Sequence, residues 1–177
     1  MIGALRLLAL GVALLAGQAL VVRLLPEAFR PDLVLVFALA MGVRRNSATL
    51  ALGLAFGFGF AFDVLTGSPG GLYALLRGTA CVATRALDRA LYLRAPVPWG
   101  LYAAGWTLAD WTLMALVLRI LRPEALPTWG EALLRAPGSA LATALAAALL
   151  LGVFRRIEMA EERDTSWSVL SPSGSRR

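Results

Sequence analysis

The stretch "FDVLTGSPGGLYALL", residues 62–76, decides how this chain folds, because it places an aspartate and three glycines between two strongly apolar segments. Serine, proline and glycine favour tight turns, and glycine adopts positive φ at little steric cost. We therefore expect residues 66–69 to leave the first segment and Gly70 and Gly71 to turn the chain straight back. Asp63 is expected to accept hydrogen bonds from free amides of the turn or of the next helix.

The composition on either side of this elbow is that of a membrane protein. Of the 177 residues, 59% are hydrophobic and only 16% are charged, and the mean hydropathy is +0.72. The apolar residues fall in long blocks, and a block of about 18 or more uncharged residues is what a hydrocarbon core of roughly 30 Å requires of a helix. Because backbone groups in lipid must be satisfied internally, the blocks are predicted to be helices. The expected fold class is an all-α, polytopic membrane bundle.

Six segments are expected to cross the membrane: residues 2–22, 32–43, 48–65, 70–92, 97–118 and 133–154. The segment 32–43 is the weakest, since about 1.5 Å per residue gives it roughly 18 Å. It needs flanking turns or a thin bilayer to cross, and the count falls to five if it is re-entrant. The last segment contains Pro137 and Gly138 and is expected to become regular only after them.

The domain organisation is expected to be simple. Residues 1–156 are predicted to form one helical bundle, and residues 157–177 a polar tail. Its charged first part is expected to extend the last helix by two or three turns, and its Ser-, Pro- and Gly-containing remainder to be disordered. The tail is either a solvated end or a docking segment for a cytoplasmic partner.

The arginines indicate the orientation. All 17 basic residues are arginine. If both termini are cytoplasmic, eleven of them lie on the cytoplasmic side and five on the outer side, as the positive-inside bias favours. The elbow then lies outside. Small residues in "LLAGQAL", residues 14–20, allow a cleaved signal peptide as an alternative, but the apolar run continues to residue 22 and we expect the segment to be retained.

The sequence contains few candidate residues for catalysis or metal binding. The chain has no histidine and a single cysteine, Cys81, so zinc and haem sites of familiar type are not expected. No phosphate-binding glycine motif is present, and no nucleophile has a base at a suggestive spacing. We expect no enzyme activity and no cofactor. The arginines are spread over loops rather than along one helix, so nucleic-acid binding is not expected.

Small residues recur every four positions in the segment 48–65. Gly53, Gly57 and Ala61 share one side of the helix, and such small-xxx-small spacing lets another helix approach closely in a bilayer. Two interpretations stay open at this point. The glycines either pack inside the bundle or form an interface with another protein.

Polar residues within the apolar segments are the second candidate group. Asp110 lies about 13 residues into its segment, where an ionised carboxylate costs at least several kcal/mol unless it is paired. Thr107, Asp110, Trp111 and Met114 lie at i, i+3, i+4 and i+7, so they share one helical side, which we expect to face inward. Arg77 is the basic residue at comparable depth. The group either fixes helix register or serves binding or ion coupling.

The elbow and its flanks resemble the rod shape-determining protein MreD family. The resemblance rests on "GFAFDVLTGSPGGLYALL", residues 59–76, preceded by "RPDLVLVFALAMGVRRN", residues 30–46, and it covers residues 25–95 well. Its specific part is the spacing Asp63, Gly67, Gly71 and Leu72. The elbow candidates are thus Asp63, Gly67, Pro69, Gly70 and Gly71.

This resemblance implies a non-enzymatic subunit of the bacterial elongation machinery in the inner membrane. The implied partners are an MreC-like periplasmic scaffold, an MreB-like actin filament, a RodA-like glycosyltransferase and a class B penicillin-binding transpeptidase. It also implies a bundle similar to the S subunits of energy-coupling-factor transporters. The alternative function is therefore a small-molecule carrier in which Arg77, Thr107 and Asp110 line a polar pocket.

Overall fold

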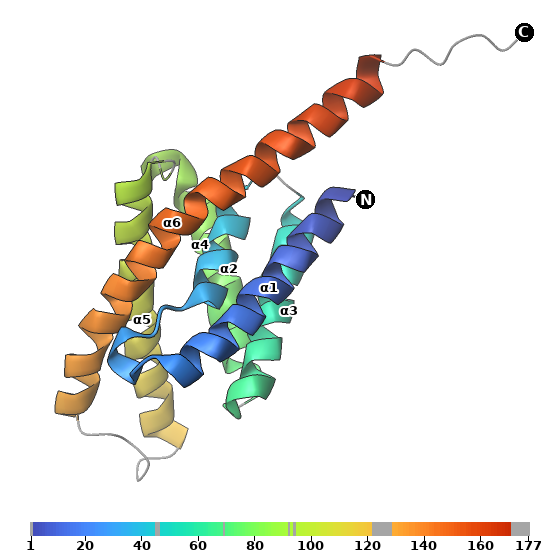
Figure 1. Ribbon diagram of the computed structural model, residues 1–177. Helices are drawn as coiled ribbons and strands as arrows, with labels where there is room; N and C mark the ends of the chain where they lie inside the picture. Colours follow the sequence, from blue (N-terminus) through green and yellow to red (C-terminus); the bar gives the residue numbers. More distant parts are fainter. Residues whose placement is uncertain are drawn as a thin grey trace, which may run out of the picture.

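The computed structural model describes residues 2–44, 47–68, 70–91, 93, 95–121 and 129–170. Within these ranges the chain forms six α-helices and one 3-10 helix, and no strand (Figure 1). The elements are α1 (Ile2–Leu24), η1 (Glu27–Phe29), α2 (Leu33–Val43), α3 (Ala48–Thr66), α4 (Leu72–Leu91), α5 (Pro96–Leu121) and α6 (Trp129–Leu170). The predicted all-α bundle is confirmed.

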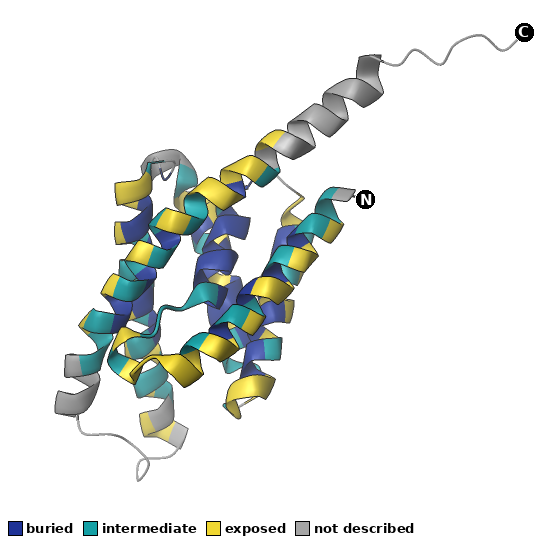
Figure 2. Ribbon diagram, in the orientation of Figure 1, coloured by how far each residue is buried: buried dark blue, intermediate teal, exposed yellow. Residues whose placement is uncertain are grey.

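Helix α2 is the centre of the bundle. Its sequence is apolar all round, and every residue from Val34 to Gly42 is buried, as the dark blue of the ribbon in Figure 2 shows. It contacts each of the other five α-helices. A helix that is hydrophobic on all sides must be enclosed by protein or by lipid, and here the five longer helices enclose it.

The length of α2 explains its unusual position. It has 11 residues, which at about 1.5 Å per residue is roughly half the thickness of a hydrocarbon core. The chain therefore enters α2 deep inside the bundle, through η1 and the extended residues 30–32. Irregular backbone at such a depth is tolerated only where protein surrounds it. Whether the segment 32–43 crosses the membrane stays a prediction.

Glycines mark the closest helix contacts. A Cβ on Gly59 would lie 2.7 Å from both Ala74 Cα and Tyr73 O of α4. A Cβ on Gly42 of α2 would lie 2.6 Å from the carbonyl oxygen of Cys81, also on α4. Any larger residue would push these backbones apart, so glycine at these two positions allows α4 to pack closely against α2 and α3.

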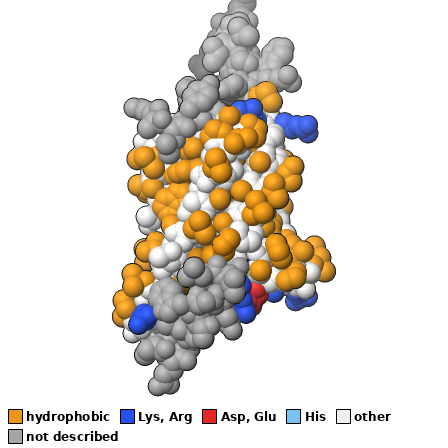
Figure 3. All heavy atoms as spheres, turned by 90° about the vertical axis from the view of Figure 1, so that its left-hand side faces the viewer, with side chains coloured by type: hydrophobic (Ala, Val, Ile, Leu, Met, Phe, Trp, Pro, Cys, Tyr) orange, Lys and Arg blue, Asp and Glu red, His pale blue; other side chains and the backbone are white. Residues whose placement is uncertain are grey.

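The two ends of the bundle differ in what they contain. The start of α1 and the end of α6 lie at one end, and the turn between α3 and α4 lies at the other (Figure 1). Large apolar side chains such as Leu5, Leu101 and Leu149 are exposed around the outside. Figure 3 shows hydrophobic side chains spread over one face, with basic side chains towards both ends. This surface suits a protein surrounded by lipid.

Three helices are long and apolar enough to cross a membrane by themselves: Gly3–Leu24, Ala48–Thr66 and Arg135–Ile157, among the residues the structure describes. Helix α4 carries Arg77, Arg85 and Asp88 and is strongly amphipathic. The number of crossings, six or five, therefore stays a prediction.

Helix α6 differs from expectation at both ends. It begins at Trp129 and runs through Pro137, whereas the sequence led us to expect regular helix only after Gly138. Gly138 lies directly against the carbonyl of Ala28 in η1, so this part of α6 is a packed helix rather than an irregular entry.

At the other end α6 continues to Leu170, beyond the two or three turns expected, through residues of high helix propensity such as Glu, Ala and Met. Residues 171–177 lie outside the described residues.

Candidate functional site

The first turn of α2 is held by its own N-cap residue and by side chains from two other helices. The Leu33 N–H donates to Gln18 Oε1 of α1 at 2.7 Å, and the Asp32 N–H donates to Thr143 Oγ1 of α6 at 3.0 Å. Asp32 is itself the N-cap, because its Oδ1 accepts from the Leu35 N–H at 2.7 Å. The first amides of a helix have no partner within the helix. These side chains supply the partners that water supplies at an exposed helix end.

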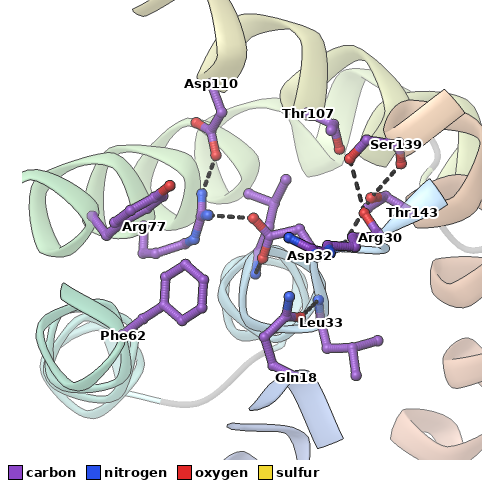
Figure 4. A network of polar contacts seen from close by, with 12 residues as sticks. Gln18, Arg30, Asp32, Leu33, Phe62, Arg77, Thr107, Asp110, Ser139 and Thr143 are labelled. Carbon is purple, nitrogen blue, oxygen red and sulfur yellow. Dashed lines mark hydrogen bonds and ion pairs between the residues drawn. The ribbon is translucent and has the colours of Figure 1, made fainter. Parts of the chain in front are cut away.

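Arg77 connects this helix end to α5. Its guanidinium donates through Nη2 to Asp32 Oδ2 at 2.5 Å and through Nη1 to Asp110 Oδ2. Figure 4 shows Arg77 between the two carboxylates. Arg77 is 0% exposed and Asp110 is 7% exposed. The guanidinium also lies over the Tyr73 ring, 5.3 Å from its centroid. We call Asp32, Arg77 and Asp110 the charge triad.

The charge triad lines a cavity of about 480 Å³. Thr107, Asp110, Trp111 and Met114 all line it, so the side of α5 predicted to face inward does so. The hydroxyl of Thr107 donates to the Ala103 carbonyl of its own helix at 2.9 Å. Thr107 therefore shares the cavity with Asp110 but has no hydrogen bond to it.

The elbow between α3 and α4 is organised by Asp63. Its Oδ1 accepts from Ser68 Oγ at 2.6 Å and from the Tyr73 N–H at 3.0 Å, and its Oδ2 accepts from the Ala74 N–H at 3.1 Å. The predicted capping of the next helix is confirmed.

Two glycines in the elbow adopt positive φ. Gly71 has φ 91°, as predicted, and the second is Gly67 at the C-cap of α3, with φ 66°, rather than Gly70. Gly67 takes this role because a left-handed residue ends the helix, where glycine is favoured. Pro69, another predicted elbow residue, lies outside the described residues.

In the predicted stripe of Gly53, Gly57 and Ala61 the two glycines face outward, and Ala61 is half-buried. No atom would lie within 4 Å of a Cβ on Gly53 or Gly57, and both glycines are exposed. The interpretation that these glycines pack inside the bundle is therefore wrong for the described part of the chain. The buried side of α3 carries Ala51, Ala55 and Gly59 instead.

Among the described residues, no group of three or more His, Cys, Asp or Glu side chains could hold a metal ion. The charge triad has two carboxylates, and Arg77 already bonds to both. The site is therefore a polar cavity built around an ion-pair network.

Comparison with known protein families gives a match. A family model described as rod shape-determining protein MreD matches residues 2–157. The chain belongs to the MreD family. The match covers all of α1 to α5 and the part of α6 that packs on them, so the resemblance of the elbow extends to the whole bundle. No curated protein and no solved structure shows a significant match to the chain. Similarity to the S subunits of transporters stays a prediction.

Sequence reasoning missed part of the site in this MreD family member. Asp32, Gln18 and Thr143 were not identified as candidates, although they place and satisfy the first turn of α2. A signal for Asp32 was present: an N-cap residue directly before an apolar run too short to span a membrane. Such an acid must lie at depth and needs a cation, which Arg77 provides. Gln18 and Thr143 are far from Asp32 in sequence, and no local pattern indicates them.

Proposed function

We propose that this protein is a non-enzymatic subunit of the bacterial cell-elongation complex that maintains rod shape by binding an MreC-like partner and so positions peptidoglycan synthesis. The observation that carries the proposal is the match to the MreD family over residues 2–157. That family consists of membrane proteins that determine cell shape. An MreB-like filament, a RodA-like glycosyltransferase and a class B penicillin-binding transpeptidase belong to the same proposed complex.

The outward face of α3 is the proposed contact for the transmembrane helix of the MreC-like partner. Gly53 and Gly57 leave the backbone of α3 open, and Phe56 and Phe60 beside them are exposed. Close backbone approach at small residues is a principal source of helix association in lipid, where apolar side chains alone gain little over lipid tails. The proposal places this face in the membrane next to the partner.

Deletion and complementation test the function. In a rod-shaped host, removal of the gene should round the cells, and the wild-type chain should restore both rod shape and co-purification of the MreC-like partner from membranes. Cells that stay rod-shaped after complete deletion, with the chain absent from the purified complex, contradict the proposal.

The proposed orientation in the inner membrane puts both termini in the cytoplasm and the elbow outside. Gly70 and Ala48 are both exposed and lie at opposite ends of α3 and the elbow. In a Cys81→Ser background, Gly70→Cys should react with an impermeant thiol reagent added to intact cells, whereas Ala48→Cys should react only after the cells are opened. The reverse pattern contradicts the orientation.

A further inference from the structure

The cavity beside the charge triad is placed like a ligand site. Its volume of about 480 Å³ lies in the range of small-molecule sites, roughly 300–1,000 Å³. It reaches the surface at Glu27 and Arg135, whose side chains are 55% and 41% exposed. Inside, Phe62, Tyr73 and Trp111 give it aromatic walls. The cavity therefore combines access from outside with a polar interior end.

The interior end has an excess of negative charge. Two carboxylates, Asp32 and Asp110, face one guanidinium, that of Arg77. The dipole of α2 compensates part of the charge of Asp32, which caps its first turn. Asp110 lies inside α5, away from both ends of its own helix. At the mouth Glu27 pairs with Arg30 and Arg135; the side chains of Glu27 and Arg135 are exposed and screened by solvent, and that of Arg30 is 30% exposed.

Two atoms of the charge triad, Arg77 Nε and Asp110 Oδ1, lack the partner that their burial requires among the described residues. Asp110 Oδ2 accepts from Arg77, but Oδ1 is buried and has no hydrogen-bond partner among the described residues. A buried carboxylate oxygen without a donor is unfavourable, more so than a neutral acceptor. Asp110 is 7% exposed and lines the cavity, but Oδ1 itself is covered, so the carboxylate has to turn for a donor in the cavity to meet Oδ1.

We propose that this cavity binds a small organic molecule through a cationic nitrogen, a primary ammonium or guanidinium group, held by Asp110. The cation balances the excess negative charge and donates to Oδ1, and the aromatic walls surround the apolar part of the molecule and attract the cation. An anionic ligand meets Asp110 and Asp32 instead and is rejected. The proposal goes beyond the shape-determining role and is tested on purified protein, so that either can fail alone.

Three probes of matched shape test the charge preference: 2-phenylethylammonium, phenylacetate and 2-phenylethanol. Isothermal titration of the full-length protein in a non-ionic detergent should give saturable one-to-one binding of the ammonium compound at millimolar concentration or below. Its affinity should exceed that of the other two by at least about tenfold, since loss of one partner of a buried charge pair is worth more than that. Equal binding of all three probes, or no binding of the ammonium compound, overturns the proposal.

Variants locate the binding. Asp110→Asn removes the charge with little change of shape and should weaken ammonium binding at least about tenfold. Asp88→Asn is the matched control, because Asp88 lies on α4 away from the cavity, and it should bind as the wild type does. Met114→Trp narrows the cavity and leaves every charge in place, so it should also weaken binding. Unchanged affinity in either folded cavity variant overturns the proposal, and if neither variant folds, the discrimination among the three probes decides.

Discussion

Helix α3 carries two stripes of small residues with the same spacing and opposite surroundings. Ala51, Ala55 and Gly59 recur every four residues and are buried. Gly53, Gly57 and Ala61, the outer stripe, have the same spacing, but both glycines are exposed and Ala61 is half-buried. Gly59 of the inner stripe brings α3 into backbone contact with α4, whereas no described atom would lie within 4 Å of a Cβ on Gly53 or Gly57 of the outer stripe. Small-residue spacing therefore indicates where a helix can be approached, but not by which neighbour.

The largest loss of stability is expected for substitution of the buried Arg77. Arg77→Met leaves Asp32 and Asp110 buried without their cation, and loss of one partner of a buried ion pair destabilises by about 3–5 kcal/mol. Asp110→Leu should destabilise the protein less, because Arg77 keeps its ion pair with Asp32. Membrane abundance and thermal unfolding in detergent check this order.

The double variant is the sharper test of the charge triad. Arg77→Met with Asp110→Leu should recover part of the loss, although Asp32 remains without its partner. Arg85→Met, at an exposed position of the same helix, is the control and should change stability by about 1 kcal/mol at most. A double variant as poor as the sum of the two single variants would show that Arg77 and Asp110 are not coupled.

The inner stripe itself gives the next largest effect. Gly59→Leu forces a side chain against the backbone at Tyr73 and Ala74, which cannot move aside as a flexible side chain could. Overpacking of this kind costs about 1–3 kcal/mol or more. We expect a lower unfolding temperature and less folded protein in membranes. Normal stability of Gly59→Leu would contradict the close approach of α3 and α4.

The sequence predicted where the helices begin and end better than it predicted which helices and side chains pack together. The predicted ends of α1 to α5 lie within a few residues of the observed ones, because capping residues and changes in hydropathy are local signals. The start of α6 was missed because Pro137, which usually breaks a helix, is tolerated within this one. The capping role of Asp63 in the elbow was predicted because all hydrogen-bond partners of Asp63 lie within 11 residues of it along the chain.

The site depended on contacts that no local pattern contains. The depth of Arg77 and Asp110 made both conspicuous, since a charge within an apolar segment needs a partner. Asp32 stands 45 residues from Arg77 in sequence and looked like the edge of a helix. Its role follows only from the enclosure of α2, which brings its first turn into the interior. Likewise, the two stripes of α3 are equivalent in spacing, and only packing distinguishes them.

The elbow should give a smaller effect than either buried contact. Gly71 has φ 91°, and a β-branched residue in such a conformation costs about 1–3 kcal/mol. Gly71→Val should therefore lower the amount of folded protein. Gly70→Val is the matched control, because Gly70 is exposed and has open space around it. If the two variants are equally stable, the conformation of Gly71 does not constrain the turn.

The outer stripe should give no effect on stability and a specific effect on assembly. Gly57→Leu adds a side chain where no atom would lie within 4 Å of the new Cβ, so the isolated protein should be as abundant and as stable as the wild type. In the proposed complex the same side chain holds the partner helix away from α3, which should reduce recovery of the MreC-like partner and round the cells. Gly105→Leu is the control, because Gly105 of α5 is also exposed with open surroundings and lies outside the proposed contact. Equal recovery of the partner with both variants would leave the outer stripe facing lipid alone. A loss of abundance in Gly57→Leu, comparable to that of Gly59→Leu, would instead mean that both stripes pack within the folded chain and would remove the distinction between them.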